Sequence, residues 1–263
     1  MLPNRIAELL EPFLAPGDER LTTNDHQLTT NDLDQISTYI DLLLRWNARI
    51  NLTAIRDPEQ IVTRHFGESF FLARHLFPPA TAHRPLTTVL DLGSGAGFPG
   101  LPIKIWEPSI HLTLVESNHK KAAFLREVAR ALTLTDINVI AERAESLAPL
   151  RAAPDRHSPK RSHRQGNNVS PSDPSAVMPH ALSRMERLEE VPPFAPADVV
   201  TFRAVERFER TLSLALRFLT PSSRLALLIT TSQLPALRAL SNLSWVIEHV
   251  PESHERLAAI GIS

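Results

Sequence analysis

The organisation of the chain follows from one stretch, Val89-Leu90-Asp91-Leu92-Gly93-Ser94-Gly95-Ala96-Gly97-Phe98-Pro99-Gly100. Its apolar start predicts a buried strand, and Pro99 suits the first turn of a helix. The chain has eight glycines, and four of them lie here. Glycines gather where the backbone needs a positive φ or must approach a ligand closely. The stretch therefore predicts a strand, a tight turn and a helix N-terminus, the arrangement with which α/β proteins bind nucleotide-like ligands.

The residue types in this loop narrow the class of ligand. A dinucleotide loop has the pattern Gly-x-Gly-x-x-Gly; Gly93 and Gly95 fit it, but Phe98 stands where the third glycine belongs. Asp91, at the end of the strand, would repel a pyrophosphate and attract a cation. S-adenosylmethionine (SAM) carries a sulfonium and an ammonium group and so fits better. Two alternatives remain open: a dinucleotide site, and a purely structural turn in which Asp91 caps the helix.

A second carboxylate follows at a matching distance. The predicted strand 112–116 ends in Glu116, about 20 residues beyond the loop, where an acidic side chain can accept hydrogen bonds from both ribose hydroxyls of a nucleoside. We therefore expect Asp91 and Glu116 to hold the two ends of SAM over the glycine turn.

Length and composition set the class of protein. The chain has 263 residues, of which 43% are hydrophobic and 22% charged, as in ordinary globular domains. With a net charge of −1, the chain has no overall positive charge that would indicate nucleic-acid binding, although basic patches can exist on a protein of neutral total charge. Because there is no cysteine and the eleven histidines lack ligand-like spacing, we expect neither disulfides nor a metal site.

The ends and the apolar runs of the chain suggest where it works. The N-terminus lacks a signal-peptide pattern, and no apolar run reaches membrane length. We expect a cytoplasmic, monomeric protein with no membrane partner.

Residues 1–82 predict helices only. A short amphipathic helix covers about 6–14, and a third helix covers about 59–76. Between them, a long helix is expected to start at a cap formed by Asn31 or Asp32 and to run to about Asn51. This segment would form an N-terminal helical extension.

From residue 87, predicted strands and helices alternate, which indicates a mostly parallel sheet covered on both faces. We expect residues 83–263 to form this α/β domain. The last two predicted strands, 245–250 and 256–262, have no helix between them and could pair as an antiparallel hairpin.

One segment, at about 148–197, interrupts the alternation. It holds nine of the 22 prolines and little apolar periodicity, and its residues 151–164 are locally basic. The pattern predicts a disordered insertion at the surface. An alternative is a basic arm that contacts RNA phosphates.

Several motifs together resemble one family. The chain is similar to the bacterial small-subunit ribosomal RNA guanine-N7 methyltransferases, the RsmG or glucose-inhibited division protein B family. Beside the glycine loop with its Phe-Pro-Gly, the resemblance rests on Asn51-Leu52-Thr53-Ala54-Ile55, Arg64-His65 with Glu68-Ser69, Arg143-Ala144-Glu145, and Asp198-Val199-Val200 through Arg203-Ala204-Val205. These pieces occur in the family's order and span about 45–220.

The resemblance implies a fold and a function. The fold would be α/β: a Rossmann-like class I SAM-dependent methyltransferase with a seven-stranded, mostly parallel sheet and the N-terminal extension. The cofactor would be SAM, and the partner would be 16S ribosomal RNA in the small ribosomal subunit. The reaction would be methylation of guanine N7, which has a lone pair and no proton, so that no general base is required.

The resemblance also implies roles for individual residues. The backbone at Gly93 and Phe98 would contact the methionine part of SAM, and Ala144 and Glu145 would lie at the adenine. Arg203 would lie at the active-site edge of the fourth strand, near the cofactor and the target base, as the candidate catalytic residue. The full expected cofactor set is Asp91, Gly93, Gly95, Gly97, Phe98, Glu116, Ala144, Glu145 and Arg203.

Other residues and functions stay open. Arg64 and His65 could reach RNA from the helical extension, or could cap and pack. The family's Lys-Gly pair after the fifth strand reads Ile229-Thr230-Thr231 here, and its C-terminal lysine is absent. These departures leave two other functions possible: a SAM methyltransferase with another substrate, and a ribosome-assembly or RNA-binding factor that binds SAM without turnover.

Overall fold

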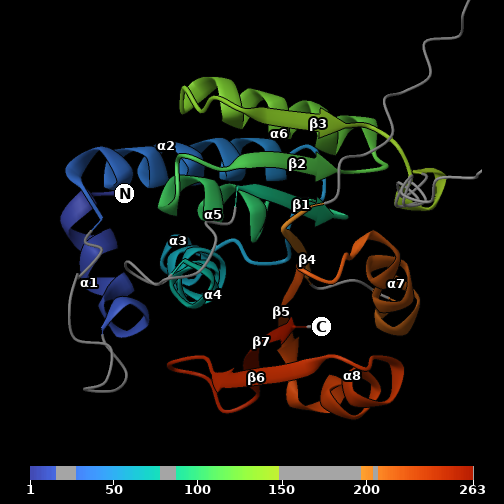
Figure 1. Ribbon diagram of the computed structural model, residues 1–263. Helices are drawn as coiled ribbons and strands as arrows, with labels where there is room; N and C mark the ends of the chain where they lie inside the picture. Colours follow the sequence, from blue (N-terminus) through green and yellow to red (C-terminus); the bar gives the residue numbers. More distant parts are fainter. Residues whose placement is uncertain (16–27, 78–86, 148–196, 204–206, 263) are drawn as a thin grey trace, which may run out of the picture.

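Seven strands form one sheet in the computed structural model, which describes residues 1–15, 28–77, 87–147, 197–203 and 207–262 (Figure 1). The strand order is β3-β2-β1-β4-β5-β7-β6. Only β7 runs antiparallel to its neighbours β5 and β6. The strands are β1 (Thr88–Leu92), β2 (His111–Val115), β3 (Ile137–Ile140), β4 (Val199–Arg203), β5 (Arg224–Thr230), β6 (Ser244–His249) and β7 (Arg256–Ile262).

This sheet confirms the predicted architecture, an α/β fold built on a seven-stranded, mostly parallel sheet. The strand order reverses between β1 and β4, which pair in parallel. In such sheets ligands bind at the carboxyl ends of the strands beside the reversal. The predicted antiparallel hairpin of the last two strands is also confirmed, as β6 pairs with β7.

Helices cover both faces. They are α1 (Pro3–Leu14), α2 (Thr30–Asn47), α3 (Pro58–Ile61), α4 (Glu68–Leu76), α5 (Gly100–Trp106), α6 (His119–Ala131), α7 (Phe208–Ala215) and α8 (Leu234–Leu240). A π-helical turn, η2 (Val62–Gly67), joins α3 to α4. The described residues also include three short 3₁₀ turns: η3 (Ala144–Ser146), η4 (Leu216–Phe218) and η5 (Thr231–Gln233).

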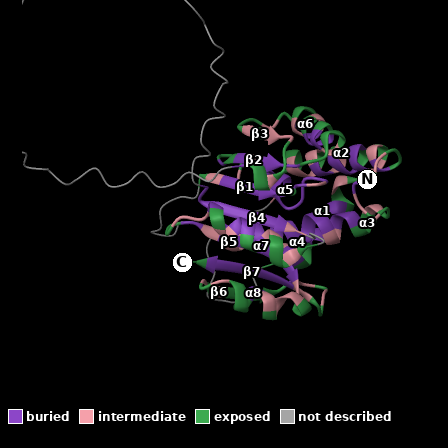
Figure 2. Cartoon of the chain, turned by 90° about the vertical axis from the view of Figure 1, so that its right-hand side faces the viewer, coloured by how far each residue is buried: buried purple, intermediate pink, exposed green. Residues whose placement is uncertain are grey.

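The core lies in two layers, one on each face. Helices α1, α2, α4, α5 and α6 bury their apolar side chains against one face, and α7 and α8 against the other. Figure 2 shows the central strands buried and the outer sides of α6 and α8 exposed. Side chains alternate along a strand, so in β1 Val89 joins the first layer and Leu90 the second. We call the first face, which carries α4 and α5, the α4 face.

The long helix α2 differs from its prediction at both ends. Its cap is Thr29, not Asn31 or Asp32: the Asp32 amide donates to Thr29 Oγ1 (3.2 Å), and the Thr29 amide donates to Asp32 Oδ2 (2.8 Å). This reciprocal pair is a capping box. The helix ends at Asn47 rather than Asn51, because the Asn47 side chain turns the chain by bonding the backbone of Leu52 and Thr53.

Two predictions fall outside the described residues. The boundary expected at about residue 82 lies within 78–86, and the disordered insertion predicted at about 148–197 lies within 148–196 except for Ala197. Ala204 and Val205, at the end of the last matching motif, also lie outside.

Candidate functional site

The glycine loop leaves β1 and needs three residues with positive φ. The φ angles are 68° at Gly93, 56° at Gly95 and 89° at Gly97, values that L-residues with a side chain avoid. A methyl group built on Gly95 would meet nothing nearer than Gly93 O, at 3.7 Å. Space is therefore open above Gly95, whereas Gly97 is closed in by Tyr39 and Leu101.

Asp91 lies beneath this loop and is fully buried. Its Oδ2 accepts a hydrogen bond from the amide of Gly100 (3.3 Å), the first residue of α5, which is the contact that the capping alternative expects. Its Oδ1 has no hydrogen-bond partner among the described residues. Burial raises the pKa of Asp91 to about 7, and the charge of Glu116 acts in the same direction. A buried carboxylate oxygen without a donor is costly, so this site suits a cation or a donor group.

Glu116 follows β2 and holds the loop from the other side. Its Oε2 accepts from the Gly95 amide (2.9 Å), and its Oε1 accepts from the Asn118 amide (2.7 Å). Each carboxylate oxygen can accept a second bond. Although it is only 7% exposed, Glu116 therefore retains acceptor capacity beside the open space at Gly95.

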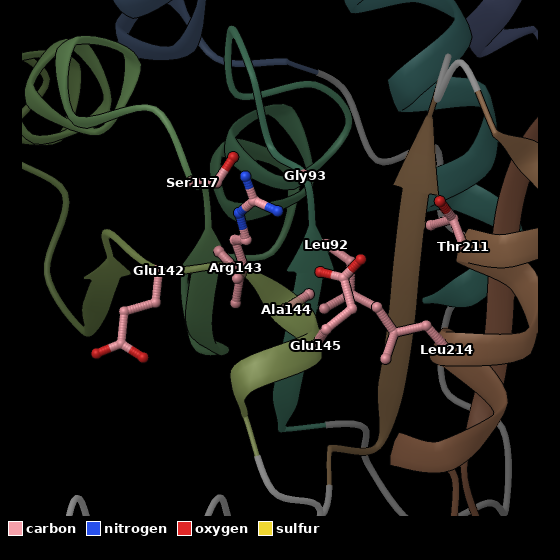
Figure 3. A pocket seen from close by; sticks show the side chains of 10 residues that line it. Leu92, Gly93, Ser117, Glu142, Arg143, Ala144, Glu145, Thr211 and Leu214 are labelled. Carbon is pink, nitrogen blue, oxygen red and sulfur yellow. The ribbon is translucent and has the colours of Figure 1, made fainter.

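A pocket of about 230 Å³ opens at the carboxyl ends of β1, β2 and β3 (Figure 3). Its lining comprises Leu92, Gly93, Val115, Ser117, Glu142, Arg143, Ala144, Glu145, Thr211 and Leu214. Three expected cofactor residues, Gly93, Ala144 and Glu145, thus meet in one place. In Figure 3 the Glu142 carboxylate points away from the other labelled side chains. The volume is below the roughly 300–1,000 Å³ of whole-ligand sites, so the pocket suits one end of an extended ligand.

A second pocket, of about 430 Å³, lies between the starts of α7 and α8. It is lined by Arg207, Phe208, Glu209, Arg210, Ser232, Gln233 and Ala236. Arg210 also pairs with Glu145 (3.0 Å), which links this pocket to the first.

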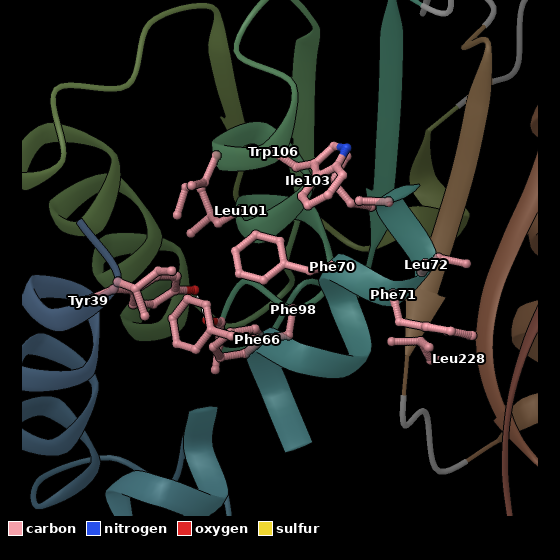
Figure 4. Close-up of a cluster of buried hydrophobic side chains, with 14 of the residues drawn as sticks. Tyr39, Phe66, Phe70, Phe71, Leu72, Phe98, Leu101, Ile103, Trp106 and Leu228 are labelled. Carbon is pink, nitrogen blue, oxygen red and sulfur yellow. Dashed lines mark hydrogen bonds between the residues drawn. The ribbon is translucent and has the colours of Figure 1, made fainter. Parts of the chain in front are cut away.

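Aromatic rings from the N-terminal helices back the loop. Tyr39 stacks on Phe98 with ring centroids 5.2 Å apart and planes 5° apart, and Phe66 meets both rings edge-on (Figure 4). The Tyr39 hydroxyl donates to the carbonyl of Ala96 (2.5 Å), inside the glycine loop. The N-terminal helices therefore fix the loop directly. The sequence prediction missed Tyr39, although a lone tyrosine on the apolar stripe of a helix needs a buried partner for its hydroxyl.

His65 continues this wall. Its ring stacks on Phe98 at 4.6 Å, and its Nε2 forms a hydrogen bond with Thr53 Oγ1 (2.8 Å). Burial and the nearby Arg203 lower the pKa of His65 to about 3, so the ring is neutral at physiological pH. Its Nδ1 is buried and has no partner among the described residues.

Arg203 ends β4 on the α4 face, and only 8% of its side chain is exposed. Its Nη2 forms an ion pair with Glu68 Oε2 (3.1 Å) and donates to the carbonyl of Arg64 (2.5 Å). Its Nη1 is buried and unpaired within the described residues. The structure thus brings Arg203 together with Glu68 and Arg64. The residue pattern alone did not indicate that Glu68 would be its counter-ion.

The expected site residues fall into two groups. Gly93, Ala144 and Glu145 line the first pocket, with Gly95 and Glu116 beside it. In the second group, Arg203 lies on the α4 face and donates a hydrogen bond to the carbonyl of Arg64. The next residue, His65, stacks on Phe98. Asp91 and Gly97 lie between the two groups, beneath and within the loop.

The described residues include neither a candidate metal site nor a candidate membrane span. No group of three His, Cys, Asp or Glu side chains there is arranged to hold a metal ion. Within the same residues, no helix combines the length and apolar character that a membrane crossing requires.

Comparison with known proteins finds one family. The family model GidB, described as rRNA small subunit methyltransferase G, matches residues 32–156. Proteins named ribosomal RNA small subunit methyltransferase G match from Chloroflexus aggregans (48% identity over 43% of this chain and 45% of that protein) and from Xylella fastidiosa M23 (50% identity over 41% and 48%). The Roseiflexus castenholzii protein of the same name is 49% identical over 43% of this chain and 46% of that protein. The chain thus spans about half the length of the relatives it matches.

Proposed function

We propose that the chain is a member of the GidB family, whose model matches residues 32–156, and that it is a SAM-dependent methyltransferase that modifies N7 of a guanine in 16S ribosomal RNA. The names of its relatives support the coarser part, methylation of small-subunit ribosomal RNA. The finer part, guanine N7, is what the resemblance of the motifs implies, and a site without a general base is compatible with it.

The observation that carries the SAM proposal is the buried Asp91 carboxylate beneath a glycine loop with open space at Gly95. This negative charge favours a cationic ligand over a pyrophosphate. In our proposal Glu116 accepts the ribose hydroxyls and the pocket at Ala144 and Glu145 takes the adenine. Gly93, Gly97 and Phe98 shape the methionine end.

SAM, when bound, supplies an electrophilic methyl group on a sulfonium. The protein's task is then to hold the nucleophile in line, a proximity effect that can contribute roughly 7–11 kcal/mol. Guanine N7 carries no proton, so no base is needed there. His65 is neutral and buried, and in our proposal it acts as a wall and not as a base.

Arg203 is the proposed catalytic residue. Its buried Nη1 has no partner in the described part of the chain, and it could donate to guanine O6 and orient the base. Glu68 and the Arg64 carbonyl hold the other end of the guanidinium, so the donor is fixed before the base arrives.

The test is methyl transfer from labelled SAM to small ribosomal subunits and to 16S ribosomal RNA, with the product mapped by mass spectrometry. We expect one 7-methylguanine. A methyl group on another atom or another RNA would contradict the proposed specificity. SAM binding without transfer would instead favour a ribosome-assembly or RNA-binding factor.

A further inference from the structure

Three arginines from three separate parts of the chain meet one buried carboxylate. Glu68 begins α4, and its side chain is 2% exposed. Its Oε1 pairs with Arg64 Nε (3.1 Å), and its Oε2 pairs with Arg203 Nη2 (3.1 Å) and Arg256 Nη1 (3.0 Å). We call Glu68, Arg64, Arg203 and Arg256 the Glu68 cluster.

The sheet itself brings two of these arginines together. Arg203 ends β4 and Arg256 begins β7, which flank β5 and both lie at the carboxyl edge of the parallel strands. Alternation along the strands puts both side chains on the α4 face, with Val199 of β4 and Ala258 of β7. Arg64 comes from the π-helical turn η2, a type of element that is frequent at functional sites.

The charges of the cluster do not balance. Three guanidinium groups face one carboxylate, so two positive charges remain uncompensated within the described residues. Three guanidinium groups this close repel each other. The arrangement is therefore a preformed place for an anion.

Exposure indicates from which side an anion would enter. The side chain of Arg64 is 42% exposed and that of Arg256 is 28% exposed, whereas Arg203 is at 8%. Arg64 and Arg256 use one nitrogen each on Glu68, and no other hydrogen bond of their side chains is found among the described residues. Their remaining guanidinium nitrogens can therefore donate to a ligand from the surface.

The cluster lies away from the adenine pocket. That pocket opens over β1, β2 and β3, whereas the cluster lies over β4, β5 and β7. If SAM binds over β1, β2 and β3, the region over β4, β5 and β7 is left for the substrate. We infer that Arg64 and Arg256, held in place by Glu68, bind a backbone phosphate of the RNA strand next to the target guanine. This inference rests on the proposed function.

Guanidinium is suited to this role, because its planar fork matches two phosphate oxygens. In this arrangement Arg203 contacts the target base, whereas Arg64 and Arg256 hold the RNA strand through its phosphate. Neither residue touches the reacting atoms in this arrangement, so both are positioning residues.

The salt dependence of RNA binding tests the inference. Binding of a 16S ribosomal RNA transcript would be measured from about 50 to about 300 mM KCl for the wild type, Arg64→Gln, Arg256→Gln and the double variant. Loss of one phosphate contact should lower the slope of log K against log salt by about 0.7–0.9. The affinity at low salt should fall about tenfold. The SAM dissociation constant should stay within about twofold.

Matched variants separate this role from a structural one. Arg238→Gln removes the same charge from an exposed position on α8, on the other face, and should leave the salt slope unchanged. Arg64→Lys and Arg256→Lys keep a charge for the phosphate and should retain the slope. If the double glutamine variant does not fold, the two single glutamine variants carry the test.

The outcomes separate the inference from the function beneath it. An unchanged slope and affinity in the glutamine variants, with wild-type transfer intact, would overturn the phosphate site alone. Loss of SAM binding with an intact slope would mean that the anion is the carboxylate of the cofactor, which also overturns the inference. A wild-type protein that binds SAM but neither binds nor methylates ribosomal RNA would refute the proposed function itself.

Discussion

Asp91 combines two roles that the sequence presents as alternatives. One oxygen supports the start of α5 through the Gly100 amide, and the other has no donor in the described structure. A cap alone would not need a second, buried and unpaired oxygen. We therefore treat the cap as the means of orienting Asp91, and the unpaired oxygen as the feature that a cationic ligand satisfies.

The raised pKa of Asp91 predicts how SAM affinity depends on pH. The pKa is about 7 because the carboxylate is buried, and a bound cation would lower it. Affinity should therefore rise with pH, by about tenfold between about pH 6 and about pH 8. Calorimetry would measure this as the ratio of wild-type to Asp91→Asn affinity, which cancels the titration of the ligand's own amino group. A ratio independent of pH would exclude contact between Asp91 and the ligand's charge.

The same pKa predicts the pH dependence of stability without ligand. The folded pKa lies above the usual value of about 3.9 for an unfolded chain, so the folded protein binds the extra proton. The free energy of unfolding should fall as pH rises from about 4 to about 7, by at most about 1.4 kcal/mol per pH unit, and Asp91→Asn should remove this slope. Urea unfolding across that range would measure it. A fall in the Asn variant as steep as in the wild type, or steeper, would contradict the raised pKa.

The hydroxyl group of Tyr39 connects the N-terminal helices to the glycine loop, and its removal tests this connection. Tyr39→Phe keeps the stacked ring but leaves the Ala96 carbonyl without its donor, at a cost of about 1–3 kcal/mol. We expect this loss in urea unfolding together with SAM binding weakened several-fold. Ile36→Val, on the same buried face of α2, should cost about 0.5–1.5 kcal/mol and leave SAM affinity unchanged. Equal affinities of the Phe variant and wild type would show that the hydroxyl serves stability alone.

At the level of elements, different glycines of the loop serve folding and ligand binding. A methyl group on Gly100 would lie 2.6 Å from Asp91 Oδ2 and 2.8 Å from Leu114, so Gly100→Ala should destabilise the fold by about 1–3 kcal/mol. Gly95 faces open space, and Gly95→Val should cost only the strain of a positive φ, about 1–3 kcal/mol, yet abolish SAM binding. Denaturation and calorimetry on both variants would test this. If Gly95→Val bound SAM normally, the space above Gly95 would not be the cofactor site.

The sequence predicted the elements best where a local pattern determines them. The alternation of strands and helices after residue 87 is confirmed, and so is the final hairpin. The prediction was wrong at the ends of α2, because the Thr29 capping box and the turn formed by the Asn47 side chain depend on individual side-chain bonds. The π-helical turn was missed for a similar reason: no local periodicity distinguishes one wider turn inside a helix.

Only part of the candidate site could be predicted from the sequence. Motifs near each other in the chain, such as the glycine loop and Glu116, are in spatial register because parallel strands place their ends at one edge. The Glu68 cluster joins positions 64, 68, 203 and 256. Its existence follows from strand register and from the packing of α4 on the sheet, and a single sequence does not encode these as a pattern.

At the scale of the whole molecule, the N-terminal helices are part of one core with the sheet. Ile6 of α1, Ile40 of α2 and Phe70 of α4 belong to the same buried layer as Leu101 of α5. The helices also supply Tyr39 to the glycine loop. A boundary near residue 82 therefore marks a change in the sequence pattern, while the residues on its two sides share one buried core.

This packing predicts the result of cutting the chain at that boundary. A fragment of residues 83–263 would expose the α4 face, whose burial contributes roughly 25 cal/mol per Å² of apolar surface, and would lose the ring stack behind Phe98. We expect it to aggregate or to unfold without cooperativity, and to bind no SAM. Size-exclusion chromatography, circular dichroism melting and calorimetry would measure this. A deletion of residues 152–178, outside the described structure, is the matched control, and it should leave SAM binding unchanged because it retains Asp91, Glu116 and the pocket lining found among the described residues. A monomeric 83–263 fragment that melts cooperatively and binds SAM with full affinity would contradict the shared core, and would make the N-terminal helices a separate domain after all.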